Sequence, residues 1–187
     1  MSKVDEILGQ ILTRYQSSFS AKVYNSENED HDILMDAFGL TPSVKRENRQ
    51  YWGRELGMCW QLLVTELAKD RCSDFKPALR IDADEPTDLF IGNDAIDTKY
   101  RIGSGDSGTL KKFKTYGKLL KEEGYRPVLL ILREDNLPAA LAACRVGGWS
   151  LIIGEDECFK YLKEKTDYDM KSFLEGKVGT YSISRDD

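Results

Sequence analysis

One run of consecutive apolar residues in the second half of the chain limits the fold more than any other feature. Val128 to Leu132 contains only aliphatic side chains, and Arg126 and Arg133 lie just outside it. A strand that shows no alternation between apolar and polar positions is buried on both faces of its sheet. The run therefore predicts a central strand with helices on both sides, which is the α/β class.

Amphipathic helices are predicted before and after the expected sheet strands. Trp52 to Lys69 carries a broad apolar stripe, and Leu110 to Glu123 carries a second one. Further strands are expected at residues 76–82, 149–154 and 180–183 (an edge strand), and further helices at 4–19, 139–144, 156–164 and 170–175. We expect the 187 residues to form one domain, 1–187, with a mixed central β-sheet flanked by helices.

Residues 86–99 predict a β-hairpin with a carboxylate on each strand. A Gly-Asn-Asp cluster at residues 92–94 separates two short strand-like segments. With the turn centred on the first two residues of this cluster, Asp88 lies roughly opposite Asp97. Because side chains alternate along a strand, Asp97 and Lys99 point to one face. The hairpin therefore predicts two carboxylates and one ammonium group on a single patch.

Such a patch suits a divalent cation better than a protein core. Magnesium takes oxygen ligands, usually one or two carboxylates, with phosphate groups and waters completing the shell. The candidate ligands are Asp88, Asp97 and the backbone carbonyl of Thr98, and the expected cofactor is Mg²⁺. The alternative is structural: Lys99 simply forms an ion pair with one of the two aspartates.

The spacing of these residues resembles the motif of the PD-(D/E)xK nuclease superfamily, which includes many type II restriction endonucleases. Asp97, Thr98 and Lys99 fit the second half of the motif. The first half departs from it, because Thr87 lies between Pro86 and Asp88. The order of helix, hairpin, helix and strand over about residues 52–154 also resembles the core of the restriction-endonuclease-like fold.

Two further segments, Tyr51 to Gly57 and Tyr100 to Gly108, look like those of the ApaLI-like group of type II enzymes. The resemblance implies Mg²⁺-dependent hydrolysis of phosphodiester bonds at a short site in double-stranded DNA, with Lys99 orienting the attacking water. It also implies a homodimer and an additional acid from a helix beside the sheet. Glu55 is the candidate for that acid, although a glutamate near a helix start also complements the helix dipole.

Two basic segments are candidates for DNA contact. The net charge of −5 is unfavourable for DNA binding, but seven Lys and Arg residues against one acid lie between Lys99 and Lys121. Residues 45–50 carry side chains of the types that read guanine and adenine edges. The glycine-rich loop 103–108 offers hydroxyl groups for phosphate contacts. The candidate DNA-binding residues are Arg46, Asn48, Arg49, Gln50, Arg101, Ser104, Ser107, Lys111 and Lys112.

Each of these segments also has a structural interpretation. Residues 45–50 and the lysines resemble an ordinary solvated helix surface. The loop could serve as a connector in which Ser107 or Thr109 caps the next helix, and such a helix N-terminus also attracts anions.

Several function classes are excluded by composition and motifs. The chain has one histidine, His31, so chemistry that needs several histidines is excluded. The loop 103–108 lacks the Gly-Lys-Ser/Thr ending of a P-loop. The four cysteines form no C-x-x-C pair and predict reduced thiols in a cytoplasmic protein. No apolar run approaches the roughly 18 residues that span a bilayer, so no membrane partner is expected.

The sequence thus predicts a Mg²⁺-dependent type II restriction endonuclease that cuts double-stranded DNA. Two alternatives remain. One is a repair or recombination nuclease of the same fold without tight sequence specificity. The other is a non-catalytic DNA-binding or scaffold protein in which the aspartates and Lys99 form salt bridges.

Overall fold

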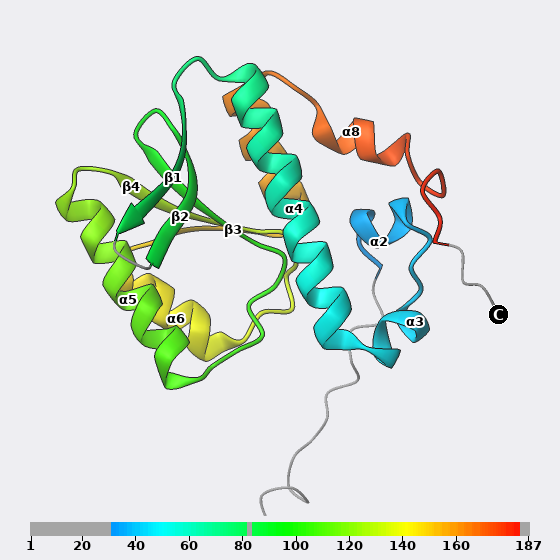
Figure 1. Ribbon diagram of the computed structural model, residues 1–187, viewed down its shortest axis with the longest axis horizontal. Coiled ribbons are helices and arrows are strands. Elements are labelled where there is room, and N and C mark those ends of the chain that lie inside the picture. Colours follow the sequence, from blue (N-terminus) through cyan, green and yellow to red (C-terminus); the bar gives the residue numbers. More distant parts are fainter. Residues whose placement is uncertain (1–30, 82–83, 184–187) are drawn as a thin grey trace, which may run out of the picture.

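A five-stranded mixed sheet forms the centre of the structure. The computed structural model describes residues 31–81 and 84–183 (Figure 1). The strands follow in chain order across the sheet: β1 (Phe75–Ile81), β2 (Asp84–Ile91), β3 (Asp94–Lys99), β4 (Arg126–Ile131) and β5 (Ser150–Ile153). β2 runs antiparallel to both of its neighbours, β1 and β3, whereas β3, β4 and β5 run parallel to one another. The predicted α/β fold with a mixed sheet is confirmed, and the helix predicted at 4–19 lies outside the described residues.

β4 is the strand predicted from the apolar run, and it is buried on both faces. All five residues from Val128 to Leu132 have no exposed surface. Val128 and Leu130 pack into the hydrophobic core on one side of the sheet, whereas Leu129 and Ile131 pack into a second core on the other side. The sheet therefore separates two cores, as expected of a strand without alternating polarity.

The first core is covered by α4 (Arg49–Arg71) and α7 (Glu155–Thr166). α4 starts earlier than the apolar pattern predicted, because Asn48 accepts a hydrogen bond from the Tyr51 amide at 3.1 Å and caps the helix. One face of α4 is fully buried, and the Trp60 indole donates a hydrogen bond to the Leu130 carbonyl at 3.3 Å. This contact fixes α4 against β4 at the centre of the sheet.

The second core is covered by α5 (Ser107–Glu122) and α6 (Pro138–Gly147), which lie side by side in Figure 1. The two helices touch through glycines. A Cβ atom added at Gly117 would overlap the Gly147 carbonyl, and one added at Gly147 would overlap the Phe113 carbonyl. The Trp149 indole donates to the same Phe113 carbonyl at 2.8 Å. Close backbone approach therefore requires glycine at both positions.

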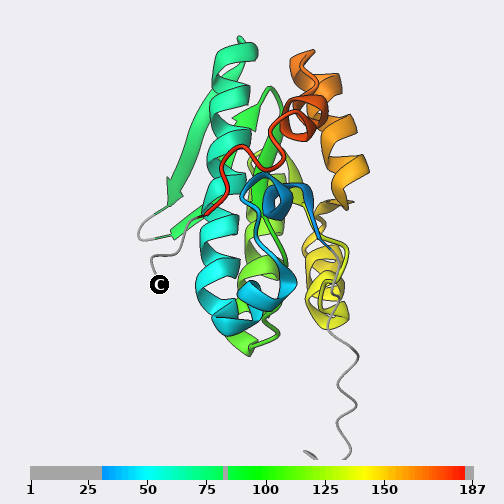
Figure 2. The same ribbon diagram turned by 90° about the vertical axis from the view of Figure 1, so that its right-hand side faces the viewer.

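Three short helices lie on the side of the sheet that holds the first core: α2 (Ile33–Ala37) and α3 (Pro42–Glu47) pack against α4, and α8 (Met170–Glu175) packs against α2 and α7. Figure 2 shows α2 and α8 in front of α4 and α7. The edge strand predicted at residues 180–183 is wrong. The Tyr181 and Ile183 amides donate instead to the carbonyls of Ala37 and Phe38, so this segment lies against α2. Among the described residues, no helix has both the length and the apolar character to cross a membrane.

Candidate active site

The β2–β3 hairpin has the register that the Gly-Asn turn predicted. Gly92 has a φ of 58°, a left-handed conformation that favours glycine. The paired residues run from Ile91 and Asp94 at the turn to Leu89 and Ile96. The next residues along the two strands are Asp88 and Asp97, where regular pairing ends. Beyond this point β2 continues to pair with β1, so β2 and β3 separate at the two aspartates.

Side chains replace the backbone ladder where the strands separate. The Thr87 hydroxyl lies 2.7 Å from the Ile96 carbonyl, to which it donates a hydrogen bond. Asp88 Oδ2 accepts from the Thr98 amide at 2.7 Å and from the Thr98 hydroxyl at 2.6 Å. Asp88 Oδ1 accepts from Gln61 Nε2 of α4 at 2.7 Å. Both oxygens of Asp88 are therefore held in place at the opening between β2 and β3.

Asp97 and Lys99 complete the cluster from β3. Lys99 Nζ lies 2.5 Å from Asp97 Oδ1 and 3.2 Å from the Thr98 carbonyl. The Asp97 side chain is 13% exposed and that of Lys99 35%, so solvent reaches the pair. Burial raises the pKa of Asp97 to about 6, with Lys99 opposing and Asp88 adding to the rise. Burial acts to lower the pKa of Lys99, but Asp97 and Asp88 outweigh it and raise that pKa. The three charges therefore act on one another at a single site.

The donor set at this opening fits a hard divalent cation bound together with a substrate phosphate. Asp88 and Asp97 supply two carboxylates. Burial and repulsion from Asp88 disfavour the charged form of Asp97, and a bound cation would stabilise that form. Within residues 31–81 and 84–183, no group of three or more His, Cys, Asp or Glu side chains is placed to hold a metal ion. Two carboxylates agree with magnesium sites, in which phosphates and waters supply the remaining oxygens.

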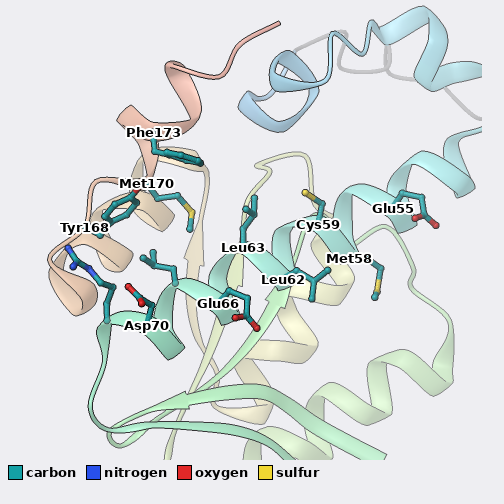
Figure 3. A pocket seen from close by; sticks show the side chains of 12 residues that line it. Glu55, Met58, Cys59, Leu62, Leu63, Glu66, Asp70, Tyr168, Met170 and Phe173 are labelled. Atoms are coloured by element: carbon teal, nitrogen blue, oxygen red, sulfur yellow. The ribbon is translucent and has the colours of Figure 1, made fainter. Parts of the chain in front are cut away.

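The structure brings Gln61, not Glu55, to the carboxylates. Glu55 pairs with Arg54 at 2.9 Å and lines a groove of about 750 Å³ along the outer face of α4, with Met58 and Leu62 (Figure 3). Residues six apart on a helix differ in direction by about 120°, so Glu55 and Gln61 point to different sides of α4. In the sequence, Gln61 is an amide at the margin of the apolar stripe of this helix, and the pattern of acidic residues does not indicate it.

The first predicted DNA-binding segment lies at the junction of α3 and α4. Arg46, Asn48, Arg49 and Gln50 are all exposed. Asn48 uses its side-chain oxygen to cap α4. The four residues therefore form one exposed group at the N-terminal end of the helix that supplies Gln61.

The second predicted segment follows β3. Arg101 pairs with Asp135 at 2.9 Å. Asp106 caps α5: it accepts from the Thr109 amide at 2.9 Å and from the hydroxyls of Ser104 and Thr109 at 2.5 and 2.7 Å. The prediction that Ser107 or Thr109 caps this helix is therefore wrong. Ser107, Lys111 and Lys112 lie exposed on its first turns.

A mixed sheet between two helical layers, with acidic and basic side chains where two strands separate, defines a protein of the restriction-endonuclease-like class. A family model described as "ApaLI-like restriction endonuclease" matches residues 78–178. This match covers more than half of the chain, and the chain belongs to that family. Membership implies a nuclease that binds DNA; restriction endonucleases usually use a divalent metal. Comparisons with curated proteins and with solved structures gave no match.

The family match includes the hairpin, α5 and α6, but it begins after α4. Asp88, Asp97, Lys99 and the loop before α5 therefore lie inside the matched residues, whereas Gln61 and residues 46–50 lie outside them.

Proposed function

We propose that this chain is a Mg²⁺-dependent type II restriction endonuclease that hydrolyses phosphodiester bonds of double-stranded DNA at a specific short site. The observation that carries the proposal is the convergence of Asp88, Asp97 and Lys99 where β2 and β3 separate. Residues 1–187 would act as a single domain, and two copies would meet a palindromic site as a homodimer.

The two aspartates would hold the metal against the scissile phosphate. Magnesium, when bound, lowers the pKa of a coordinated water and neutralises charge on the phosphate. Asp88 is held by Gln61 and Thr98 before any ligand arrives, so little reorganisation is needed on binding. The Thr98 carbonyl lies beside the same site and would offer a further oxygen, since Lys99 Nζ is already 3.2 Å from it.

Lys99 would act on the reacting groups directly. Its ammonium group donates hydrogen bonds from a position fixed by Asp97. From there it would orient the attacking water. It would also place a positive charge beside the oxygens of the scissile phosphate, where negative charge develops. Fixed charges of this kind commonly contribute about 3 kcal/mol to transition-state stabilisation.

Contacts with DNA would come from both exposed groups. Arg46, Asn48, Arg49 and Gln50 would read base edges, because their side chains match guanine and adenine patterns. The second group, Arg101, Ser104, Ser107, Lys111 and Lys112, would contact phosphates and set the position of the duplex on the site.

Digestion of a supercoiled plasmid of known sequence tests this function. Purified protein with Mg²⁺ is expected to give discrete fragments whose mapped ends share one short sequence, and the metal chelator EDTA should stop the reaction. A continuous smear would indicate a repair or recombination nuclease. An uncut plasmid would indicate a non-catalytic protein in which the Lys99–Asp97 contact is only structural.

Asp97→Ala and Lys99→Ala provide the matched test of the site. Both variants should lose cleavage while circular dichroism stays unchanged, whereas Glu164→Ala, which removes an exposed acid from α7, should cut like the wild type. Full activity in either site variant would end the assignment of these residues.

A further inference from the structure

Two polar clusters with the same four residue types anchor the two ends of β3. At its first residue, Asp94 accepts hydrogen bonds from Arg126 at 2.6 Å and Tyr161 at 2.8 Å, and pairs with Lys165 at 2.9 Å. This set is called the Asp94 cluster below.

The second cluster lies just past the other end of β3. The Tyr100 hydroxyl donates a hydrogen bond to Asp32 and accepts one from Lys45 Nζ at 2.6 Å. Asp32 also accepts from Arg133 at 2.8 Å. Asp32 and Arg133 are almost fully buried, as is Tyr100. This set is called the Tyr100 cluster.

The two clusters tie β3 to different parts of the chain. The Asp94 cluster joins it to β4 and α7, both within the residues that match the family model. The Tyr100 cluster joins it to α2, whose N-cap is Asp32, and to α3, which carries Lys45. α2 and α3 lie outside the family match, and α3 leads directly into residues 46–50.

The hydrogen bond between Lys45 and Tyr100 links the start of the first proposed DNA-binding group to the end of the strand that carries Lys99. Lys45 precedes Arg46 in the chain, and Tyr100 follows Lys99. The Lys45 ammonium also lies 4.8 Å from the centre of the Tyr100 ring. Burial and the nearby Arg133 lower the pKa of Lys45 to about 8, although Asp32 opposes them. The ammonium is therefore held against the tyrosine at an electrostatic cost, rather than extended into solvent.

We propose that Lys45 and Tyr100 are positioning residues that hold the base-reading segment 46–50 at a fixed place relative to Lys99, so that the fit of the DNA sequence controls cleavage. The inference rests on the proposed function. The inference gives the Tyr100 hydroxyl a role in specificity. This hydroxyl is not needed to fill the buried space, because a phenylalanine side chain would fill it equally well.

The two clusters supply a matched pair of variants. Tyr100→Phe and Tyr161→Phe each remove one buried hydroxyl from an Asp–Arg–Lys cluster at one end of β3. Tyr100→Phe removes two hydrogen bonds and Tyr161→Phe removes one, so both variants should lose thermal stability. The informative measurement is the ratio of kcat/KM for the mapped cleavage site to kcat/KM for sites altered at one base pair.

Tyr100→Phe should lower this discrimination ratio by about five- to tenfold, the range that corresponds to one hydrogen bond. Tyr161→Phe should keep the wild-type ratio. If both variants lose stability and both keep the ratio, the Tyr100 cluster is only structural and the inference is overturned. If the wild type cuts no DNA, the proposed function itself has failed, which is a different result.

A double-mutant cycle separates positioning from direct DNA contact by Lys45. Lys45→Met should lower the ratio as Tyr100→Phe does. The double variant should be no worse than either single variant, because each single variant already removes the Lys45–Tyr100 hydrogen bond. If the loss of the ratio in the double variant equals the product of the two single losses, Lys45 acts on DNA independently of Tyr100, and the inference is overturned. Because Lys45 is only half-buried, this variant tests the inference even if Tyr100→Phe fails to fold.

Discussion

The Asp88 carboxylate occupies the place at which the backbone amide of Thr98 would otherwise meet a strand partner, 2.7 Å from that nitrogen. The hairpin pairing has already ended at Leu89 and Ile96. A side chain thus takes over the hydrogen-bonding role of the missing strand, and one of the proposed metal ligands is fixed by the secondary structure itself.

Gln61→Ala should lower the cleavage rate and raise the Mg²⁺ concentration needed for half-maximal activity. Gln61 Nε2 holds Asp88 Oδ1, and residues that orient metal ligands typically change activity or metal affinity by about 10- to 100-fold. Activity is measured as a function of Mg²⁺ concentration. Glu66→Ala, an exposed position on the same helix, is the control and should behave as the wild type. An unchanged Mg²⁺ profile for Gln61→Ala would remove Gln61 from the site.

Acid should weaken the fold through Asp94. Burial acts to raise the pKa of Asp94, but hydrogen bonds from Arg126, Lys165 and Tyr161 outweigh it and lower that pKa from 3.8 to about 2. A lowered pKa gives stability that is present above pH 4 and is lost as the pH falls from about 4 to about 2. The shift corresponds to about 2 kcal/mol of unfolding free energy.

Urea unfolding of wild type and Asp94→Asn at several pH values measures this contribution. The variant should be less stable at pH 7, and the gap should narrow as the pH falls towards 2. Asp156→Asn removes an acid that is 85% exposed and paired with Lys171, so it should change stability little at any pH. If the difference in unfolding free energy between wild type and Asp94→Asn stays constant with pH, the charge of Asp94 does not contribute to stability as predicted.

Gly117→Ala should destabilise the protein by more than about 2 kcal/mol, because the added methyl group overlaps the Gly147 backbone and neither helix can move without opening the second core. Gly53→Ala is the matched control. It also lies inside a helix, but its Cβ would meet no atom within 4 Å. That variant should gain about 0.5–1 kcal/mol from helix propensity. Differential scanning calorimetry gives both values, and equal effects of the two substitutions would rule out the close α5–α6 contact.

Lys111→Ala should weaken binding to all DNA sequences about equally, because a phosphate contact carries no sequence information. The slope of log K against log salt should become less steep by about 1. Fluorescence anisotropy with Ca²⁺ in place of Mg²⁺, in several salt concentrations, measures the slope. Lys171→Ala removes a lysine that pairs with Asp156, and it should leave the slope as it is. A sequence-dependent loss for Lys111→Ala would indicate base contact instead.

Local sequence patterns predicted the parts of the site that lie on one hairpin. The Gly92–Asn93 turn fixed the register, and alternation along β3 placed Asp97 and Lys99 on one face. The apolar run predicted β4 in the same way, because a strand buried on both faces is recognised by apolar side chains at consecutive positions. These features depend on interactions within a few residues of the chain, so they are visible without a tertiary structure.

The contacts that depend on docking between distant elements were not predicted. Which side of α4 faces the hairpin opening is set by the packing of Trp60 and its neighbours, and this packing brings Gln61 rather than Glu55 to Asp88. The hydrogen bonds of Tyr100 to Asp32 and Lys45 span 68 and 55 residues, so no local pattern indicates them. Residues 180–183 have strand-forming side chains, but α2 offers carbonyls at Ala37 and Phe38 instead of a sheet edge.

Thr87 has a consequence for how related chains are found. Its hydroxyl satisfies the Ile96 carbonyl at the last paired position, so the extra residue between Pro86 and Asp88 fits without disturbing the turn. The position of Asp88, the proposed first acid, coincides with the point where β2 departs from β3. Searches that tolerate one residue between the proline and the aspartate would recover chains that a strict Pro-Asp pattern leaves out.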